Sequence, residues 1–395
     1  MKVKNENKRN RYIEKELKIA LQFSKIILIN GMIGCGKTTL LKQFKEGRAH
    51  VDLSKKDKQL FAINHPELFF KELKFPVILE NIEEAPQLYG IIFVNKDRIK
   101  SGDIILTSNI RPTVALTNFI KTMDNTISVF KLNYLTAKES EQFDLNFNNL
   151  KLPVNLETKD NILSLAQRAF DFGSQIKGKE IITKVINNAL KHNYKGSELE
   201  ILPDLLIELA KAQDKVINVA RLAILFDKPK QLINSLLILL EKTQVIFFLK
   251  PIQDERLKYT TKTERLYFYN QSLVCSLLKI KSSDLLTISP YSDSIINAYL
   301  INQIMINFNN RQITNIYNYY ENINGQAVNL IINNVGSLNL IQFQIKMINE
   351  KKLGQIEKIF QKANIKLESS LVVSYDVDSI TDTGVFSAVT PDIIG

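Results

Sequence analysis

The sequence predicts an α/β fold in which a parallel sheet occupies the N-terminal part of the chain. Residues 25–30, 76–79 and 103–107 are apolar runs without alternation, a pattern typical of central strands that helices cover on both faces. A fourth candidate strand covers residues 127–132. Because helical stretches separate these runs, the pattern indicates strands that alternate with helices in one layered domain.

The composition is that of an ordinary folded protein of several domains. The chain has 395 residues, of which 45% are hydrophobic, with 14 Gly and 10 Pro. This excludes a fibrous or disordered chain and suggests two or three domains. Cys35 and Cys275 are too few for a disulfide framework or a zinc site and fit a reducing compartment. His50, His65 and His192 are scattered, so no metal cluster is predicted.

The charge balance indicates an anionic partner. Lys and Arg number 52 against 41 Asp and Glu, a formal net charge of +11. Such a surplus suits a protein that binds nucleic acid or nucleotide, or one from a genome rich in Lys, Asn and Ile. The polar N-terminus does not resemble a secretory signal, and no apolar run approaches the roughly 18 residues that a membrane span needs. We therefore expect a soluble, cytoplasmic protein without a membrane partner.

Changes in the hydrophobic period predict four domains. The sheet domain covers residues 1–152, and residues 153–200 have apolar positions at helical spacing that suit a small helical lid. Residues 201–285 contain three short amphipathic helices followed by two strand-like runs, which is the outline of a winged helix. Residues 286–395 change again to one helix with further strands, so they predict a small α/β domain.

A glycine-rich motif follows the first strand directly. Residues 31–38 read GMIGCGKT and satisfy G-x-x-x-x-G-K-[ST], with a strand before the motif and a helix after it. In such a P-loop, backbone N–H groups surround a β-phosphate, Lys37 reaches the β- and γ-oxygens, and the Thr38 hydroxyl ligates Mg²⁺. The motif therefore predicts that a nucleotide is bound by Gly31, Met32, Ile33, Gly34, Cys35, Gly36, Lys37, Thr38 and Thr39.

The second strand ends in the acidic segment that such a loop requires. Glu80 is placed to hold the water shell of Mg²⁺, and Asn81 stands at the next position. Lys37, Glu80 and Asn81 are therefore the candidate catalytic positions, although an amide cannot accept a proton from water. Glu83 and Glu84 are the alternative acids, but both lie past the predicted strand end. The sequence thus predicts binding with slow or absent turnover.

The third strand ends in the polar residues Thr107, Ser108 and Asn109. Asn109 is placed where it could sense a γ-phosphate, and a simple turn at the strand end is the alternative interpretation.

The chain resembles prokaryotic AAA-type P-loop ATPases, which join an ATPase core to a winged helix and a C-terminal domain like restriction endonucleases. The matching stretches occur in the same order as in that family. The resemblance rests on the stretches GMIGCGKTTLL, HVDLSKKD, HPELFF, PVILENIEEAPQL, IILTSN, FKLNYLTAKE, LLEKTQVIFFLKP and RLYFYNQSL. It implies ATP as the nucleotide, Mg²⁺ as the cofactor, and assembly into a homo-oligomer. It also implies an arginine supplied by a neighbouring subunit, for which Arg111 is one candidate.

This chain differs from the family at positions where the family has acidic residues. The family's Asp-Glu pair reads Glu80-Asn81 here, and its nuclease-like domain carries metal-binding acids beside a lysine. Amides are poor Mg²⁺ ligands compared with carboxylates. The positions that correspond to the family's nuclease residues are Asn297, Asn329, Gln344 and Lys346. The resemblance therefore implies a nuclease-like module without activity. The alternative is that the register differs and these strands form an ordinary core sheet.

Two basic segments account for part of the positive charge. The leader contains Lys2, Lys4, Lys8, Arg9 and Arg11, and the predicted wing contains Arg256, Lys258, Lys262 and Arg265. Wings of this kind commonly meet phosphates, so these four wing residues are the candidate DNA contacts.

The sequence thus favours an ATP-binding protein that acts as a nucleotide-controlled switch for DNA or for a protein partner. An active ATPase coupled to remodelling is the alternative, and an Mg²⁺-dependent nuclease is disfavoured because its acids are missing.

Overall fold

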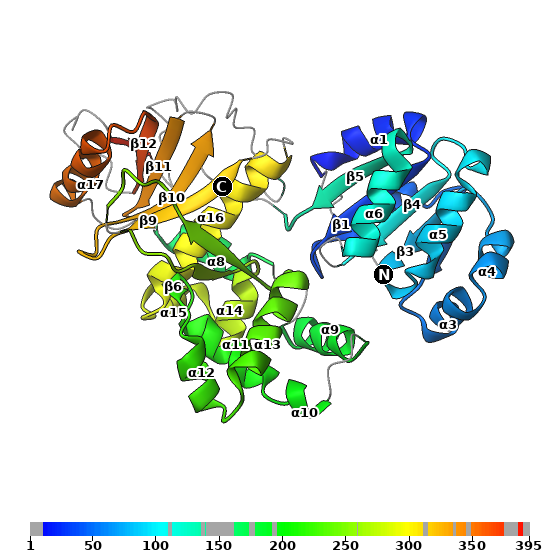
Figure 1. Ribbon diagram of the computed structural model, residues 1–395, viewed down its shortest axis with the longest axis horizontal. Helices are drawn as coiled ribbons and strands as arrows, with labels where there is room; N and C mark the ends of the chain where they lie inside the picture. The colour runs from blue at the N-terminus through cyan, green and yellow to red at the C-terminus, as the bar shows by residue number, and fades with distance from the viewer. Residues whose placement is uncertain are drawn as a thin grey trace, which may run out of the picture. The chain divides into compact units, whose positions relative to one another are not determined.

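The structure is a computed structural model (Figure 1). The chain divides into two compact units. The structure describes residues 11–109, 113–135, 139, 162–173, 178–191, 196–258, 260–310, 315–334, 337–344, 349–374 and 386–389. Unit 1 comprises Met1–Leu135 with Leu239–Gln244, and unit 2 comprises Thr136–Ile238 with Val245–Gly395. The predicted boundary between residues 152 and 153 lies outside the described residues.

Unit 1 is built on a five-stranded parallel sheet in the order β2-β3-β4-β1-β5. Every residue of β1, β3 and β4 is buried, which explains why these runs are apolar throughout and do not alternate. In register, Ile26 of β1 pairs with Ile104 on one side and Ile127 on the other. The predicted parallel sheet is confirmed, with strands β1 Ile26–Gly31, β3 Val77–Glu80, β4 Ile104–Ser108 and β5 Ile127–Leu132. The edge strand β2 Ala49–Asp52 was not predicted from the sequence.

Helices cover this sheet and bury its apolar side chains. One core cluster joins alternate residues of β1, such as Ile26 and Leu28, to Ala62, Leu88 and Phe119 on the covering helices. Another helix, α1, packs against β1 and β5. The helices are α1 Ile13–Phe23, α2 Lys37–Leu41, α3 Lys56–Asn64, α4 Pro66–Glu72, α5 Gln87–Val94 and α6 Val114–Met123. Short 3₁₀ turns are η1 Lys42–Phe44, η2 Ile82–Glu84, η3 Lys96–Arg98 and η4 Asp124–Thr126.

Unit 2 begins with helices that pack on one another. The predicted lid residues form α8 and α9, and α8 contacts α14, α15 and α16 within this unit. The Asn270 amide donates to the Gly173 carbonyl over 3.0 Å and so ties the end of α8 to the start of α14. These helices are α8 Ile162–Asp171, α9 Gly178–Lys191, α10 Gly196–Leu199, α14 Gln271–Leu277, α15 Ser283–Thr287 and α16 Ser292–Asn310.

Residues 202–268 of the predicted winged-helix segment form three helices and three strands, and α14 with the start of α15 follows them within the segment. In chain order the elements of residues 202–268 are α11 Leu202–Lys211, β6 Lys215–Val216, α12 Val219–Leu225, α13 Lys230–Lys242, β7 Ile246–Pro251 and β8 Arg265–Phe268. The strand β8 pairs antiparallel with β6 on one side and with β7 on the other. The Asn218 side chain caps α12 by accepting a hydrogen bond from the Arg221 N–H over 3.0 Å.

The C-terminal segment continues this sheet rather than forming a separate one. The strand β7 also pairs in parallel with β9, where Lys250 lies beside Asn318. The complete order is β13-β12-β11-β10-β9-β7-β8-β6. The helix α17 packs its Phe360 into the core beside Tyr320 and Leu340. The remaining elements are β9 Ile316–Glu321, β10 Ala327–Asn334, β11 Ser337–Phe343, α17 Glu350–Lys362, β12 Leu367–Val373 and β13 Phe386–Val389.

This shared sheet differs from the two domains that the sequence predicted on either side of residue 285.

None of the helices in the described part of the chain is long and apolar enough to span a bilayer.

Candidate functional site

The predicted phosphate loop lies between the end of β1 and the start of α2. Gly34 and Gly36 have φ values of 80° and 96°, which residues with a side chain rarely adopt. A Cβ atom on Gly31 would lie 2.3 Å from the carbonyl oxygen of Leu132. The loop therefore requires glycine for two physical reasons, its left-handed backbone and its close contact with β5.

Lys37 is buried and its ammonium group is held by the loop itself. Its Nζ donates to the carbonyl oxygens of Gly31 over 2.6 Å and of Met32 over 2.8 Å. Binding a phosphate would exchange these carbonyl acceptors for charged oxygens, which form stronger hydrogen bonds.

Glu80 lies at the carboxyl end of β3 and reaches the loop. Its Oε2 accepts a hydrogen bond from the Thr38 hydroxyl over 2.6 Å, and its Oε1 lies 2.6 Å from Nε2 of His50. Thr38 and Glu80, the two oxygen donors predicted for Mg²⁺, are therefore adjacent, and His50 of β2 is a neighbour that the sequence did not place there.

Asn81 turns away from the direction of the strand. It has a left-handed backbone with φ 62°, a conformation that Asn tolerates better than most residues. Its Nδ2 donates to Oδ1 of Asp52 over 2.7 Å, and its Oδ1 accepts from the Asn109 side chain. Asn109 and Asn81 are thus brought together, with their amides bonded to each other.

Glu83 lies on the η2 turn and folds back over the end of β4. Its Oε1 accepts a hydrogen bond from the Asn109 N–H over 2.9 Å. Burial raises the pKa of Glu83, while the N–H group of Asn109 and the charge of Lys37 lower it in part. Its charge interacts with Lys37 and it contacts Asn109, so Glu83 belongs to the site that the sequence assigned to Asn81.

Arg11 also lies beside the phosphate loop. The sequence indicated it only as one of several basic residues of the leader. Its guanidinium donates to the Cys35 carbonyl over 2.9 Å and to the Asn133 carbonyl over 2.7 Å. It therefore joins the phosphate loop to the end of β5. The other basic leader residues lie outside the described part of the chain, as does Arg111.

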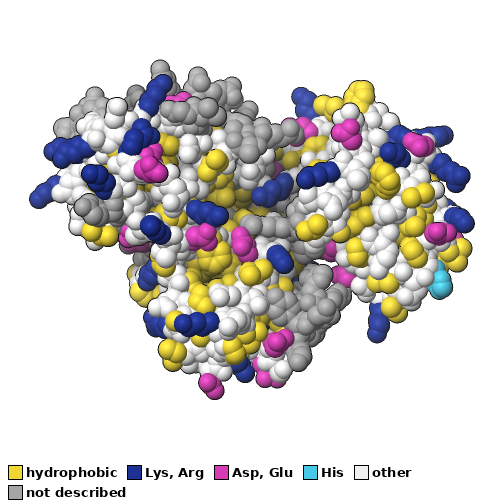
Figure 2. Space-filling model, viewed as in Figure 1, with side chains coloured by type: hydrophobic (Ala, Val, Ile, Leu, Met, Phe, Trp, Pro, Cys, Tyr) yellow, Lys and Arg dark blue, Asp and Glu magenta, His cyan; other side chains and the backbone are white. Residues whose placement is uncertain are grey.

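The four predicted DNA contacts differ in exposure. Arg256 is exposed and pairs with Asp254 over 2.7 Å, while Lys258 and Lys262 are exposed. Figure 2 shows Lys and Arg side chains distributed over both units among acidic ones. Arg265 differs from the other three because its side chain is only 12% exposed.

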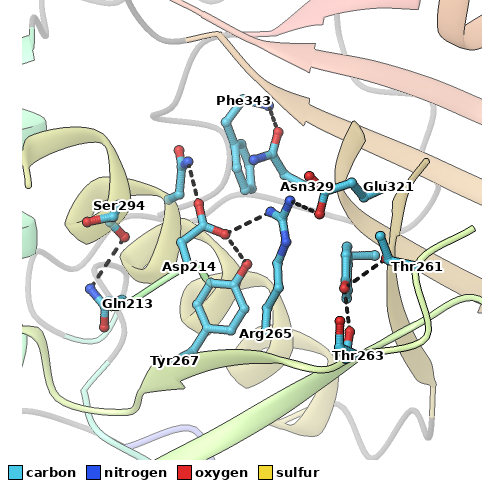
Figure 3. A network of polar contacts seen from close by, with 12 residues as sticks. Gln213, Asp214, Thr261, Thr263, Arg265, Tyr267, Ser294, Glu321, Asn329 and Phe343 are labelled. Carbon is cyan, nitrogen blue, oxygen red and sulfur yellow. Dashed lines mark hydrogen bonds and ion pairs between the residues drawn. The ribbon is translucent and has the colours of Figure 1, made fainter. Parts of the chain in front are cut away.

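Arg265 is the centre of a partly buried polar network, shown in Figure 3. Its guanidinium donates to Asp214 over 3.1 Å and to Glu321 over 2.9 Å, and it lies 4.6 Å from the centroid of the Tyr319 ring. Although burial alone would lower the pKa of Arg265, Asp214 and Glu321 raise it. This corrects the sequence-based picture of Arg265 as an open surface cation, because its hydrogen-bond donors face protein acids.

The predicted degenerate nuclease positions are bonded to protein groups. Asn297 of α16 donates to Asp214 over 3.2 Å and so joins the same network. Asn329 of β10 accepts from the Phe343 N–H over 3.0 Å, as Figure 3 also shows. Gln344 accepts from the Asn349 N–H, and Lys346 lies outside the described residues. Among the described residues, no group of three or more His, Cys, Asp and Glu side chains could hold a metal.

Residues 173–284 match a family described as a domain of unknown function, DUF8612. No curated protein matches the chain.

Several solved structures are similar to this chain at low identity. The Walker-type ATPase PABY2304 of Pyrococcus abyssi has 13% identity and a TM-score of 0.38, over 68% of this chain and 95% of that one. The STAND protein PH0952 from Pyrococcus horikoshii, with a tetratricopeptide repeat sensor, has 13% identity and a TM-score of 0.25, over 77% of this chain and 48% of that one. Drosophila ORC bound to AT-rich DNA and Cdc6 has 10% identity and a TM-score of 0.20, over 68% of this chain and 90% of that one. Because these TM-scores are low, the candidate site is argued from its own geometry alone.

The Arg265 network predicts a large stability difference between two wing arginines. Replacing Arg265 with Met leaves the partly buried carboxylates Asp214 and Glu321 without their cation, so the free energy of unfolding should fall by about 1.5–3 kcal/mol. The matched control is Arg256→Met, which removes an exposed cation and should leave the unfolding midpoint unchanged. Denaturant unfolding followed by circular dichroism measures both, and equal midpoints for the two variants would show that the network is not stabilising.

Proposed function

We propose that this chain is an AAA-type P-loop protein that binds ATP with Mg²⁺ and hydrolyses it slowly. The observation that carries the proposal is the position of the loop. It connects β1, which lies between β4 and β5 in the parallel sheet, to α2, and Glu80 of β3 reaches the Thr38 hydroxyl over 2.6 Å. Ligands of open parallel sheets bind at the carboxyl ends of the strands, and this loop lies at that edge.

The donor set supports Mg²⁺ as the cofactor. Thr38 and Glu80 provide a hydroxyl and a carboxylate within hydrogen-bond distance of each other, and Mg²⁺ prefers such hard oxygen ligands. Thr38 would hold the ion directly and Glu80 would hold it through water. The ion would offset the negative charge of the phosphates.

Slow hydrolysis follows from the groups around Asn81. An ATPase needs a base or a positioned group for the attacking water, and the Asn81 amide cannot accept a proton. Both ends of this amide are also bonded, to Asp52 and to Asn109.

A DNA-binding role for unit 2 is a second proposal. The order of three helices with β6-β8-β7 as an antiparallel sheet supports a winged helix at residues 201–285. Lys258 and Lys262 are exposed in the segment between β7 and β8, where a wing would lie. We propose that ATP binding in unit 1 controls how this surface engages DNA, with a protein partner or a homo-oligomer contact as the alternative.

Nuclease activity is not proposed. Three expected carboxylate positions are the amides Asn297, Asn329 and Gln344, and each is hydrogen-bonded to protein groups. The order α16-β9-β10-β11-α17-β12 nevertheless supports a restriction-endonuclease-like arrangement for residues 286–395, which we propose serves as a scaffold.

ATP binding is tested by Lys37→Ala. Loss of a charge-assisted contact to phosphate should weaken ATP about ten- to a hundredfold, which corresponds to about 1.5–3 kcal/mol. Fluorescence titration with a labelled ATP analogue and Mg²⁺ measures the affinity. Lys121→Ala, an exposed change on α6, is the control and should bind as the wild type does. Equal affinity for all three proteins would contradict the proposed site.

Slow turnover is tested by steady-state phosphate release. We expect a kcat well below the enzyme median of about 10 s⁻¹. A rate near that median that Lys37→Ala abolishes would keep the nucleotide site and contradict slow hydrolysis.

The DNA proposal predicts a change in salt dependence. Replacing Lys258 and Lys262 together with Gln should weaken binding to all sequences alike and reduce the slope of log K against log salt by about 1.8, since each phosphate contact contributes about 0.9. Gel-shift titrations between low and physiological salt measure this slope. Lys351→Gln with Lys358→Gln on α17 makes the same charge change on another exposed surface and serves as the control. No wild-type binding at low salt would favour a protein partner instead.

A further inference from the structure

The Glu83 carboxylate is the feature of the nucleotide site that the proposed function leaves unused. The left-handed backbone of Asn81 reverses the chain after β3, and the Glu84 N–H closes the turn on the Asn81 carbonyl over 3.0 Å. The Asn81 N–H donates to the Thr107 hydroxyl over 3.1 Å and so fixes this turn to β4. The turn carries Glu83 to the end of β4, where the Asn109 N–H holds its Oε1.

The second oxygen of Glu83 is buried and has no hydrogen-bond partner among the described residues. Buried carboxylate oxygens are normally paired, and an unpaired one is costly and therefore calls for a functional explanation. Burial also raises the pKa of Glu83, which makes its carboxylate a stronger base.

The neighbouring acids are already engaged. Both oxygens of Glu80 are bonded, to Thr38 and to His50. Glu84 accepts from the Gln59 amide over 2.7 Å, and Asp52 accepts from the Asn81 amide. Of these four acids at the carboxyl edge of the sheet, Glu83 has the buried oxygen that nothing in the described structure satisfies.

We propose that Glu83, rather than the residue after Glu80, is the general base for ATP hydrolysis at this site. The inference rests on the proposed binding of ATP at the phosphate loop. Water forms a bond from its oxygen to the γ-phosphorus, and the bond from that phosphorus to the bridging oxygen breaks as ADP leaves. The proton of the water passes to Oε2 of Glu83 and then to solvent.

The enclosure of this oxygen gives a physical reason for slow turnover. Oε2 is buried, so water reaches it only when the groups that cover it move. Catalytic hydrogen bonds are often incomplete before substrate binds, so the enclosed position does not conflict with the role.

The experiment compares Glu83→Gln with the matched control Glu67→Gln, which makes the same change on an exposed residue of α4 in the same unit. Each protein is assayed for affinity towards a labelled ATP analogue with Mg²⁺ and for phosphate release, beside wild type and Lys37→Ala. We expect Glu83→Gln to bind like wild type and to lose about a hundredfold in kcat, the lower end of the usual contribution of a general base. Glu67→Gln should stay within about twofold of wild type on both measures.

Two further measurements separate a catalytic role from a structural one. Thermal unfolding of Glu83→Gln should occur at or above the wild-type temperature, because the change removes a buried charge. Glu83→Asp keeps the carboxylate on a shorter stem and should recover part of the lost kcat.

Each result decides between the two proposals. Glu83→Gln with wild-type turnover overturns the role of Glu83 and leaves ATP binding in place. Wild-type turnover no higher than that of Lys37→Ala, with ATP still bound, also overturns it, because no base is then at work. Wild type and Lys37→Ala that bind ATP equally weakly mean instead that the proposed nucleotide site has failed.

Discussion

The carboxyl edge of the parallel sheet is the constraint on which the candidate site depends. Parallel strands end on one side, so residues that are far apart in sequence, such as Thr38, Glu80 and Asn109, meet there. The glycines of the phosphate loop then allow its backbone to pass within contact of β5 and to turn into α2. The loop follows directly on β1, which is buried throughout between β4 and β5, so it is attached to a core element of the scaffold.

Much of unit 1 could be predicted because its signals are local. The apolar runs of β1, β3 and β4 and the spacing of the loop motif are properties of short segments, and the structure has them at the expected places. Glu83 could not be placed in the same way. Its position depends on one left-handed residue, Asn81, and a sequence pattern indicates that such a residue is tolerated without showing which direction the chain takes afterwards.

Unit 2 was harder to predict because its contacts are long-range. The pairing of β7 with β9 joins two predicted domains in one sheet, and no local pattern encodes which strand edges meet. Arg265 shows the consequence for function. Among nearby basic residues it looks like a phosphate contact, whereas Asp214 and Glu321, which are distant in sequence, occupy its guanidinium. Arg11 at the phosphate loop is a similar case, since its partners lie 24 and 122 residues away.

The central claim is that the loop holds the phosphates of ATP, and a crystal structure with a slowly hydrolysed ATP analogue and Mg²⁺ tests it most directly. The account predicts phosphate oxygens within hydrogen-bond distance of the loop N–H groups. It also predicts that Lys37 Nζ moves from the carbonyls of Gly31 and Met32 to those oxygens, with the metal beside Thr38 and Glu80. Nucleotide bound elsewhere, or Lys37 still bonded to both carbonyls with nucleotide present, would contradict it.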